Sequence, residues 1–150
     1  MTSGASDPGR LIGDVARQLG ISTRTLRYYE ERGLIEAQPR ATGNRRYRDA
    51  DVDRVVRIRE LQSMMGFNLD EIAAILAAED DLARLRAEWQ SGQPTGRRDE
   101  IVREALAINR RLQDQVHDKL DRLQKFLDEL EGNARRYRRV AREIAAERDQ

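Results

Sequence analysis

The chain of 150 residues contains no cysteine and a single histidine, His117. Disulfides, thiolate metal sites and thiol-based redox sensing are therefore excluded, and we expect neither a metal nor a cofactor. No apolar run approaches the roughly 20 residues that a membrane-spanning helix requires. Residues 1–10 carry no hydrophobic stretch of the secretory type, so we expect a disordered N-terminus, no membrane partner and a cytoplasmic protein.

Aromatic residues are also scarce, at 5%, while charged residues make up 37% of the chain. That charged fraction exceeds the ~25% of an average soluble domain and is typical of long exposed helices or of disorder. Leucine and isoleucine recur at helical spacing, which favours helices. The net charge is only +1, but arginines without any acid occupy residues 17–29 and residues 40–48. Two such basic stretches predict a localised contact surface for phosphate.

The first basic stretch has the pattern of a helix, a tight turn and a second helix. Residues 12–19 carry apolar side chains on one helical face, and Gly20 follows as a helix-ending glycine. Ser22 stands at the N-cap of the second helix, which Gly33 ends. In a helix-turn-helix, the second helix can enter the DNA major groove with its N-terminal turn toward the bases.

Hydroxyl groups and arginines fill the first turns of this second helix. Hydroxyls can contact base edges or phosphates, and an arginine can read guanine with two hydrogen bonds. Of the two adjacent tyrosines, we expect Tyr28 to contact DNA and Tyr29 to enter the core. The alternative is an ordinary amphipathic surface helix with solvated arginines. The candidate DNA-binding residues of this helix are Ser22, Thr23, Arg24, Thr25, Arg27 and Tyr28.

A short hairpin with a basic tip is predicted next. Pro39 and Gly43-Asn44 mark turns, and residues 35–37 and 45–47 flank them. Its candidate DNA contacts are Arg45, Arg46 and Tyr47. Two more helices follow, the first capped by Asp49 or Asp51 and the second, from residue 69, by Asn68. Residues 11–78 are therefore expected to form one DNA-binding domain.

The second half of the chain predicts a rod. Residues 79–96 form the expected linker with a short helix, and residues 97–131 carry apolar side chains at steps of four and three. About 30 such residues make a helix of roughly 45 Å, whose apolar stripe needs a partner helix. Extra steps of four between Leu112 and Leu120 indicate a stutter. The predicted dimerisation residues are Ile101, Ala105, Ile108, Leu112, Val116, Leu120, Leu123, Leu127 and Leu130.

A basic tail is predicted after the rod, at residues 132–150, because Gly132-Asn133 has the composition of a helix end. Tyr137, Val140 and Ile144 share one face of this tail helix. Its arginines are solvated, contact phosphate or form an effector-dependent latch. Our hypothesis is that the tail docks near the partner's DNA-binding domain and sets the spacing of the two recognition helices. Trp89 is interpreted as a packing residue over the linker, with stacking on a flat ligand as the alternative.

Two segments together resemble the MerR family of bacterial transcription regulators. They read LIGDVARQLGISTRTLRYYEERGLI and TGNRRYRDADVDRVVRIRELQSMMGFNLDEIAAIL. The resemblance implies a winged helix-turn-helix dimer in which the two rods run antiparallel. It implies base recognition by residues 22–25 and Arg27, phosphate contact by Tyr28, and wing contact by Arg45 and Tyr47. Metal- and oxidant-sensing relatives use cysteines, which this chain does not contain.

The sequence thus predicts a mostly α-helical fold, with a winged helix-turn-helix domain before a long coiled-coil dimerisation helix. The predicted function is a homodimeric regulator, not an enzyme, that binds a pseudo-palindromic element in double-stranded promoter DNA. The resemblance implies distortion of an overlong promoter spacer so that RNA polymerase can engage. The alternatives are an excisionase-like or architectural DNA-binding protein and a coiled-coil adaptor for protein partners. The acid-free basic stretches argue against the adaptor.

Overall fold

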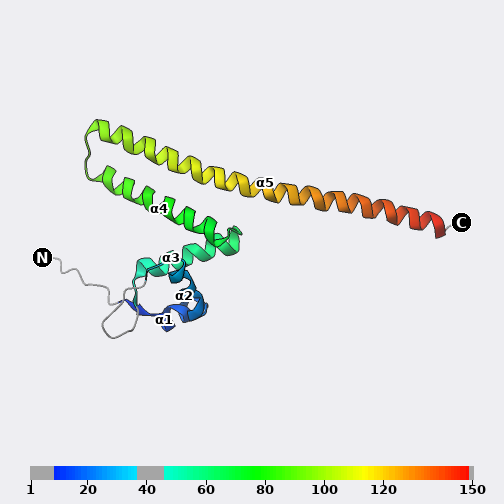
Figure 1. Ribbon diagram of the computed structural model, residues 1–150, viewed down its shortest axis with the longest axis horizontal. Coiled ribbons are helices and arrows are strands. Elements are labelled where there is room, and N and C mark those ends of the chain that lie inside the picture. The colour runs from blue at the N-terminus through cyan, green and yellow to red at the C-terminus, as the bar shows by residue number, and fades with distance from the viewer. Residues whose placement is uncertain (1–8, 37–45, 149–150) are drawn as a thin grey trace. The chain divides into compact units, whose positions relative to one another are not determined.

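The computed structural model describes residues 9–36 and 46–148, and Figure 1 shows the course of the chain. Its contacts divide the chain into two compact units that meet in sequence at Asp80 and Asp81. We name them the N-terminal unit and the C-terminal unit and describe each by itself. No helix in the described ranges is both long and apolar enough to span a bilayer.

The N-terminal unit is built from short helices and one small sheet. Its elements are β1 Arg10–Leu11, α1 Ile12–Leu19, α2 Thr23–Glu31, β2 Arg46–Tyr47, α3 Asp49–Arg59, a π-helical turn at Glu60–Met64 and the first part of α4, Leu69–Gln90. Gly20 and Gly33 end α1 and α2 with positive φ values of 62° and 69°. The predicted helix-turn-helix is therefore confirmed, together with both of its helix-ending glycines.

Side-chain caps fix the starts of the next two helices. Asn68 and Glu71 form a reciprocal box before α4, in which each side chain accepts the other's backbone N–H at 2.9 Å. At the start of α3 the buried Asp51 accepts the Arg48 backbone N–H at 2.7 Å. Asp51 rather than Asp49 thus caps α3, while Asn68 has its predicted role.

The core of the N-terminal unit collects apolar side chains from all of its helices. Leu26 on α2, Val55 and Ile58 on α3, and Ile72 on α4 have no exposed surface. Fully burying a side chain of this size stabilises the fold by about 1.5–3 kcal/mol. The other buried side chains are Val15, Ala16, Tyr29, Leu34, Ile35, Tyr47, Asp51, Val52, Leu61, Phe67, Ile75 and Leu76.

The small sheet differs from the predicted hairpin. β2 pairs antiparallel with β1, with Arg10 opposite Tyr47 and Leu11 opposite Arg46, so the partner strand comes from the N-terminal segment. At the predicted partner segment, Ile35 packs in the core and the preceding Leu34 carbonyl accepts from Arg54 Nε of α3 at 2.6 Å. The predicted disorder of residues 1–10 is accordingly wrong at Arg10. Residues 37–45, the predicted tip, lie outside the described residues.

Helix α4 is longer than predicted. It continues from Leu69 to Gln90, so a helix end at residue 78 and a separate short helix from residue 80 are both wrong. Residues 77–81 contain neither glycine nor proline, so nothing in their sequence breaks the helix. The side chains of Glu79 and Asp80 also bind α3, through Arg57 at 2.6 Å and Arg54 at 2.8 Å.

The C-terminal unit is a helical hairpin with one very long arm. Helix α5, Thr95–Arg148, contains 54 residues and is therefore about 80 Å long. Figure 1 shows it turning back along the last part of α4 and continuing as a single rod to its C-terminal end. The predicted end at Gly132-Asn133 is wrong, because one interior glycine costs a helix only about 1 kcal/mol relative to alanine.

Candidate nucleic-acid interface

The first turn of α2 presents polar side chains to solvent. Ser22 accepts the Thr25 backbone N–H at 3.0 Å, and their two hydroxyls lie 2.9 Å apart. Thr23 and Arg24 are exposed, while Thr25 is half-buried. The Ser22 and Thr25 hydroxyls are thus engaged in the cap, and Thr23 and Arg24 are the most accessible side chains of this turn.

Arg24 and Arg27 differ from the other arginines of the N-terminal unit. Both are exposed, and neither is hydrogen-bonded or ion-paired with any residue in the described ranges. The other described arginines of this unit all have acidic, amide or carbonyl partners, and these arginines are Arg10, Arg17, Arg32, Arg46, Arg48, Arg54, Arg57 and Arg59. Arg24 and Arg27 are therefore the described guanidinium groups of this unit that stand ready for an external anion.

The two adjacent tyrosines of α2 face opposite ways. Tyr28 is 45% exposed, whereas Tyr29 is buried and donates its hydroxyl to Gln62 Oε1 at 3.2 Å. Burial raises the pKa of the Tyr29 hydroxyl, with a smaller opposing effect from Arg59. Tyr28 lies one turn beyond Arg24, so its ring is on the surface beside the free arginines.

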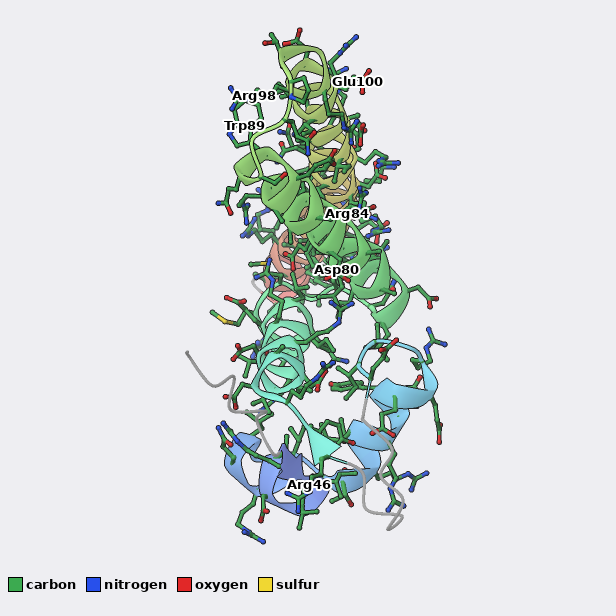
Figure 2. All side chains as sticks on the ribbon, turned by 90° about the vertical axis from the view of Figure 1, so that its left-hand side faces the viewer. Arg46, Asp80, Arg84, Trp89, Arg98 and Glu100 are labelled. Carbon is green, nitrogen blue, oxygen red and sulfur yellow. The ribbon has the colours of Figure 1, made fainter. Side chains whose placement is uncertain are left out.

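The predicted wing contacts have other roles in the described chain. The Tyr47 side chain is fully buried and its hydroxyl donates to the Glu30 carboxylate, so it links β2 to α2 instead of facing solvent. Arg46, labelled in Figure 2, is half-buried and donates to the Gly9 carbonyl at 2.8 Å. Arg45 lies outside the described residues. No sequence pattern signalled the burial of Tyr47, because its neighbours come from α2 and from the N-terminal segment.

Helix α2 is held at its C-terminal half. Arg32 pairs with Asp70 at the start of α4, Glu30 with Tyr47 of β2, and Tyr29 with Gln62 after α3. These contacts leave the opposite end of α2, with Thr23 and Arg24, on the surface. A helix anchored in this way can insert its first turn into a groove without losing its packing.

The first predicted dimerisation residues pack within their own chain. Ile101 and Ile108 are buried in the C-terminal unit, and Ala105 and Leu112 are half-buried there. Ile101 and Ala105 also line a groove between α4 and α5, together with Leu82 and Leu85 of α4. Ile101 and Ile108 thus belong to the core of the hairpin, and the dimerisation role of this part of the stripe stays a prediction.

A different face of α5 is mostly apolar and largely exposed along its length, with Asn109 and Gln113 as its polar positions. Its residues follow strictly alternating steps of four and three, with no stutter, and we name them the α5 seam. The predicted stutter is the place where the pattern passes from the face against α4 to this exposed face. The α5 seam consists of Val102, Leu106, Asn109, Gln113, Val116, Leu120, Leu123, Leu127, Leu130, Ala134, Tyr137, Ala141 and Ile144.

The turn of the hairpin carries an ion-pair cluster around Arg97. Its guanidinium contacts Glu88 at 2.6 and 2.8 Å, Glu104 at 2.8 Å and Glu100 at 3.1 Å. Glu88, Glu104 and Glu100 raise the pKa of Arg97, and Arg97 in turn lowers the pKa of Glu88. The cluster fastens the end of α4 to the start of α5.

An apolar groove lies beside this cluster, between α4 and α5. It has a volume of about 490 Å³ and is lined by Leu82, Leu85, Arg86, Trp89, Ile101, Val102, Ala105, Leu106 and Asn109. Trp89 is 42% exposed, and the Arg98 guanidinium lies 5.1 Å from its ring centre. Figure 2 shows these two residues together at the turn of the hairpin.

Comparison with known proteins finds similarity to regulators of transcription. Residues 11–79 match the family described as MerR HTH family regulatory protein. The HTH-type transcriptional activator TipA of Streptomyces coelicolor is 42% identical over 82 residues, which cover 53% of this chain and 32% of TipA. The chain thus spans about a third of that relative.

Two further likenesses extend over more of the chain. The HTH-type transcriptional regulator YfmP of Bacillus subtilis is 28% identical over 123 residues, covering 81% of this chain and 87% of YfmP. The crystal structure of a putative MerR family transcriptional regulator from Listeria monocytogenes has a TM-score of 0.50, with 19% identity and 85% of each chain covered. At that identity, the structural likeness concerns the fold alone.

Proposed function

Because residues 11–79 of this chain belong to the MerR family of helix-turn-helix regulatory proteins, we propose that the chain binds promoter DNA and regulates transcription. The observation that carries the proposal is the state of Arg24 and Arg27. These arginines are exposed and have no partner in the described chain. They lie on α2, whose C-terminal half is fixed by contacts with the rest of the unit. Cations placed in this way favour phosphate and guanine as partners.

The proposed DNA contacts fall into two groups according to their position on α2. Thr23 and Arg24, in the first turn, face the base edges, and Arg27 and Tyr28, one turn later, face the phosphate backbone. Ser22 and Thr25 orient the first turn through the hydrogen bonds of the N-cap. Their hydroxyls contact DNA with the hydrogen-bonding positions that the cap leaves unused. Arg45 and Arg46 add further DNA contacts, while Tyr47 links β2 to α2.

The regulator acts as a homodimer that joins two such units through α5. The exposed apolar α5 seam supports this, since a helix about 80 Å long cannot cover that face within its own chain. Two recognition helices in one dimer suit a pseudo-palindromic element. The dimer distorts an overlong promoter spacer for RNA polymerase, at a DNA deformation cost of about 1–6 kcal/mol that phosphate contacts offset.

A selection from random DNA duplexes tests this function, because it identifies the operator and the specificity together. The full chain should enrich a two-fold symmetric motif, and Arg24→Ala should abolish the enrichment at the positions that Arg24 contacts. Arg17→Ala is the matched control, because Arg17 is also exposed but pairs with Asp14 at 3.3 Å.

Three other outcomes would each contradict the proposal. Retention of DNA without any enriched motif would indicate an architectural binder. Failure to retain DNA even at low salt would leave the protein-adaptor interpretation. An Arg24→Ala variant with the wild-type motif would remove Arg24 from base recognition.

A further inference from the structure

We propose that the α5 seam pairs with a second copy in one defined antiparallel register, in which the partner's tail closes the apolar groove of the C-terminal unit. The inference rests on the proposed homodimer and deepens it. It assigns a partner to each seam residue except Ile144 and a function to residues 132–148, for which the sequence left solvation, phosphate contact and an effector-dependent latch open.

The seam is long enough to include the tail. It runs from Val102 to Ile144 without a break in its spacing, because α5 does not end at Gly132. Leu106 is 65% exposed and Tyr137 is 62% exposed, although both lie on this regular apolar face. A helix face with this spacing packs against another helix through knobs and holes along its whole length.

Charges beside the seam decide the direction of the partner helix. In a parallel pair, each flanking residue faces the residue five positions further along the partner. Arg98 would then face the partner's Arg103, and Asn133 would face the partner's Arg138. No residues of opposite charge would meet on either side of the seam, and the like-charge pair of Arg98 and the partner's Arg103 would lie beside the groove. An antiparallel pair is favoured because it brings opposite charges together.

Charges also select one antiparallel register, in which the two-fold axis passes between Asp121 and Arg122 of the two copies. Arg110 then faces the partner's Glu131. Near the ends of the seam, Arg98 faces the partner's Glu147. Each of these opposite-charge pairs occurs twice in a symmetric dimer, because the two copies exchange roles across the axis.

The seam residues meet in regular layers in this register. One like-charge flank pair remains, Arg103 with the partner's Arg138, against the two opposite-charge pairs. The attractions therefore outnumber the repulsion. The layers are Leu120 with the partner's Leu123, Val116 with the partner's Leu127, Gln113 with the partner's Leu130, Asn109 with the partner's Ala134, Leu106 with the partner's Tyr137, and Val102 with the partner's Ala141.

A register shifted by one heptad toward the C-terminus is worse. It places Arg110 opposite the partner's Arg138, which replaces an attraction by a repulsion. It also places the apolar Val102 opposite the partner's Arg148. No opposite-charge flank pair compensates, so this register loses on charge, while on apolar coverage it exchanges the layer of Val102 for one between Leu106 and the partner's Ile144.

A register shifted by one heptad toward the N-terminus is also worse. It joins Arg103 to the partner's Glu131, but it places Lys119 opposite its own copy at the centre of the dimer. It further leaves Tyr137 without an apolar layer, although its ring is large and exposed in the single chain. Charge and apolar coverage together therefore favour the register with the axis between residues 121 and 122.

This register brings the tail onto the groove. The groove residues Val102 and Leu106 are themselves seam residues, and they meet the partner's Ala141 and Tyr137. On the flank, Ala105 of the groove faces the partner's residue 140, a valine. The half-exposed indole of residue 89 forms the opposite wall. The groove is thus an open surface in one chain and an enclosed apolar pocket with walls from both chains in the dimer.

Cysteine cross-linking tests the register on the full chain, because the chain has no cysteine of its own. Leu106→Cys with Tyr137→Cys should form a covalent dimer with a short bis-maleimide. The register controls combine Leu106→Cys with Leu130→Cys or with Ile144→Cys, which mark the two shifted registers. Within one helix, residues 106 and 137 lie about 46 Å apart, so the reagent cannot join them in one chain.

The possible outcomes separate the register from the dimer. A higher yield from either shifted pair would overturn the register, and cross-linking of Leu106→Cys alone would show a parallel pair. Covalent dimers from none of the variants, when sedimentation shows dimers, would place the interface elsewhere. Monomers in sedimentation of the wild-type chain would contradict the proposed homodimer itself.

Fluorescence of Trp89, the chain's one tryptophan, gives a second measurement that concerns the groove. Tyr137→Ala should shift the emission to longer wavelength and increase quenching by acrylamide, because the partner's ring no longer covers the indole. Arg139→Ala is the control on the same tail, since Arg139 lies on the face of α5 away from the seam. Unchanged emission and quenching in a dimeric Tyr137→Ala variant would show that the tail does not cover Trp89.

Discussion

Tyr28 and Tyr29 are neighbours in sequence but belong to different parts of the protein, the surface and the core. That division was predictable, because consecutive residues on a helix point about 100° apart and Leu26 fixes the buried side. Which arginines remain free was not predictable. The acids that engage the others, such as Asp70 and Glu79, lie far along the chain and become neighbours only in the fold.

The assignment of Tyr47 to the fold, and not to DNA contact, can be tested by removing its hydroxyl group. Tyr47→Phe removes the hydrogen bond to Glu30 and should lower the free energy of unfolding by about 1 kcal/mol, as chemical denaturation would measure. Tyr28→Phe is the matched control, which should keep the wild-type unfolding curve. If Tyr47→Phe keeps full stability but loses DNA affinity, Tyr47 is a DNA contact after all.

Arg27 belongs to the same scale, as a proposed contact to the DNA backbone. Arg27→Ala should weaken binding to all duplexes alike and reduce the salt dependence of binding by about one phosphate contact. A titration of affinity against salt, with Arg17→Ala as the control, measures this slope. The wild-type slope in Arg27→Ala would show that Arg27 does not touch a phosphate.

Helix boundaries show what can be learned from sequence at the level of elements. Gly20, Gly33 and Asn68 mark true boundaries, because a left-handed glycine or a capping side chain is a local device. Gly132 has the same composition signal but lies inside α5, because residues that favour helix continue on both sides. A glycine in the sequence cannot by itself show whether the helix continues past it, because that also depends on the residues and packing on both sides.

Gly132→Ala should therefore stabilise the chain. An added Cβ meets only the Arg135 Nη2 atom, at 3.9 Å, and alanine favours the helix interior by up to about 1 kcal/mol. Thermal unfolding followed by circular dichroism should show a higher midpoint. A lower midpoint would mean that residue 132 adopts the left-handed conformation of a helix end.

The α5 seam shows a second limit of sequence at this scale. Both faces of α5 carry apolar residues near residues 101–112, and a pattern of spacings alone merges them into one stripe with a stutter. Only the packing of Ile101 and Ile108 in the hairpin separates the face used within the chain from the face left for a partner. The residues from Val116 to Leu130 were predicted as a dimer interface, and this part stays a prediction.

Charges in the middle of the seam should separate the two copies. Leu120→Asp with Leu123→Asp should give monomers in sedimentation, because each buried unpaired carboxylate costs several kcal/mol. Lys125→Asp is the control, since it also adds an acid to α5 but lies away from the seam. A dimer that survives the double substitution would show that the rod is not the interface.

For the whole molecule, the tail is the segment whose role depends on assembly. Truncation after Glu131 removes the layers at Val102, Leu106 and Asn109 but keeps the layers nearest the two-fold axis. The truncated chain should therefore still dimerise, with a larger dissociation constant, and should leave Trp89 more accessible to acrylamide. An unchanged dissociation constant in sedimentation would mean that the tail is a passive solvated helix.

The internal pairing of arginines has a consequence for how the protein would respond to osmotic stress. Bacterial cells adjust their potassium concentration with the osmolarity of the medium, and each protein–phosphate contact makes DNA affinity fall as cation concentration rises. Arginines that are already paired within the fold add little to that dependence, whereas Arg24 and Arg27 add to it. A chain with 37% charged residues can thus hold its DNA through few ionic contacts. Its occupancy of a promoter would then vary less with cell potassium than its arginine content alone implies.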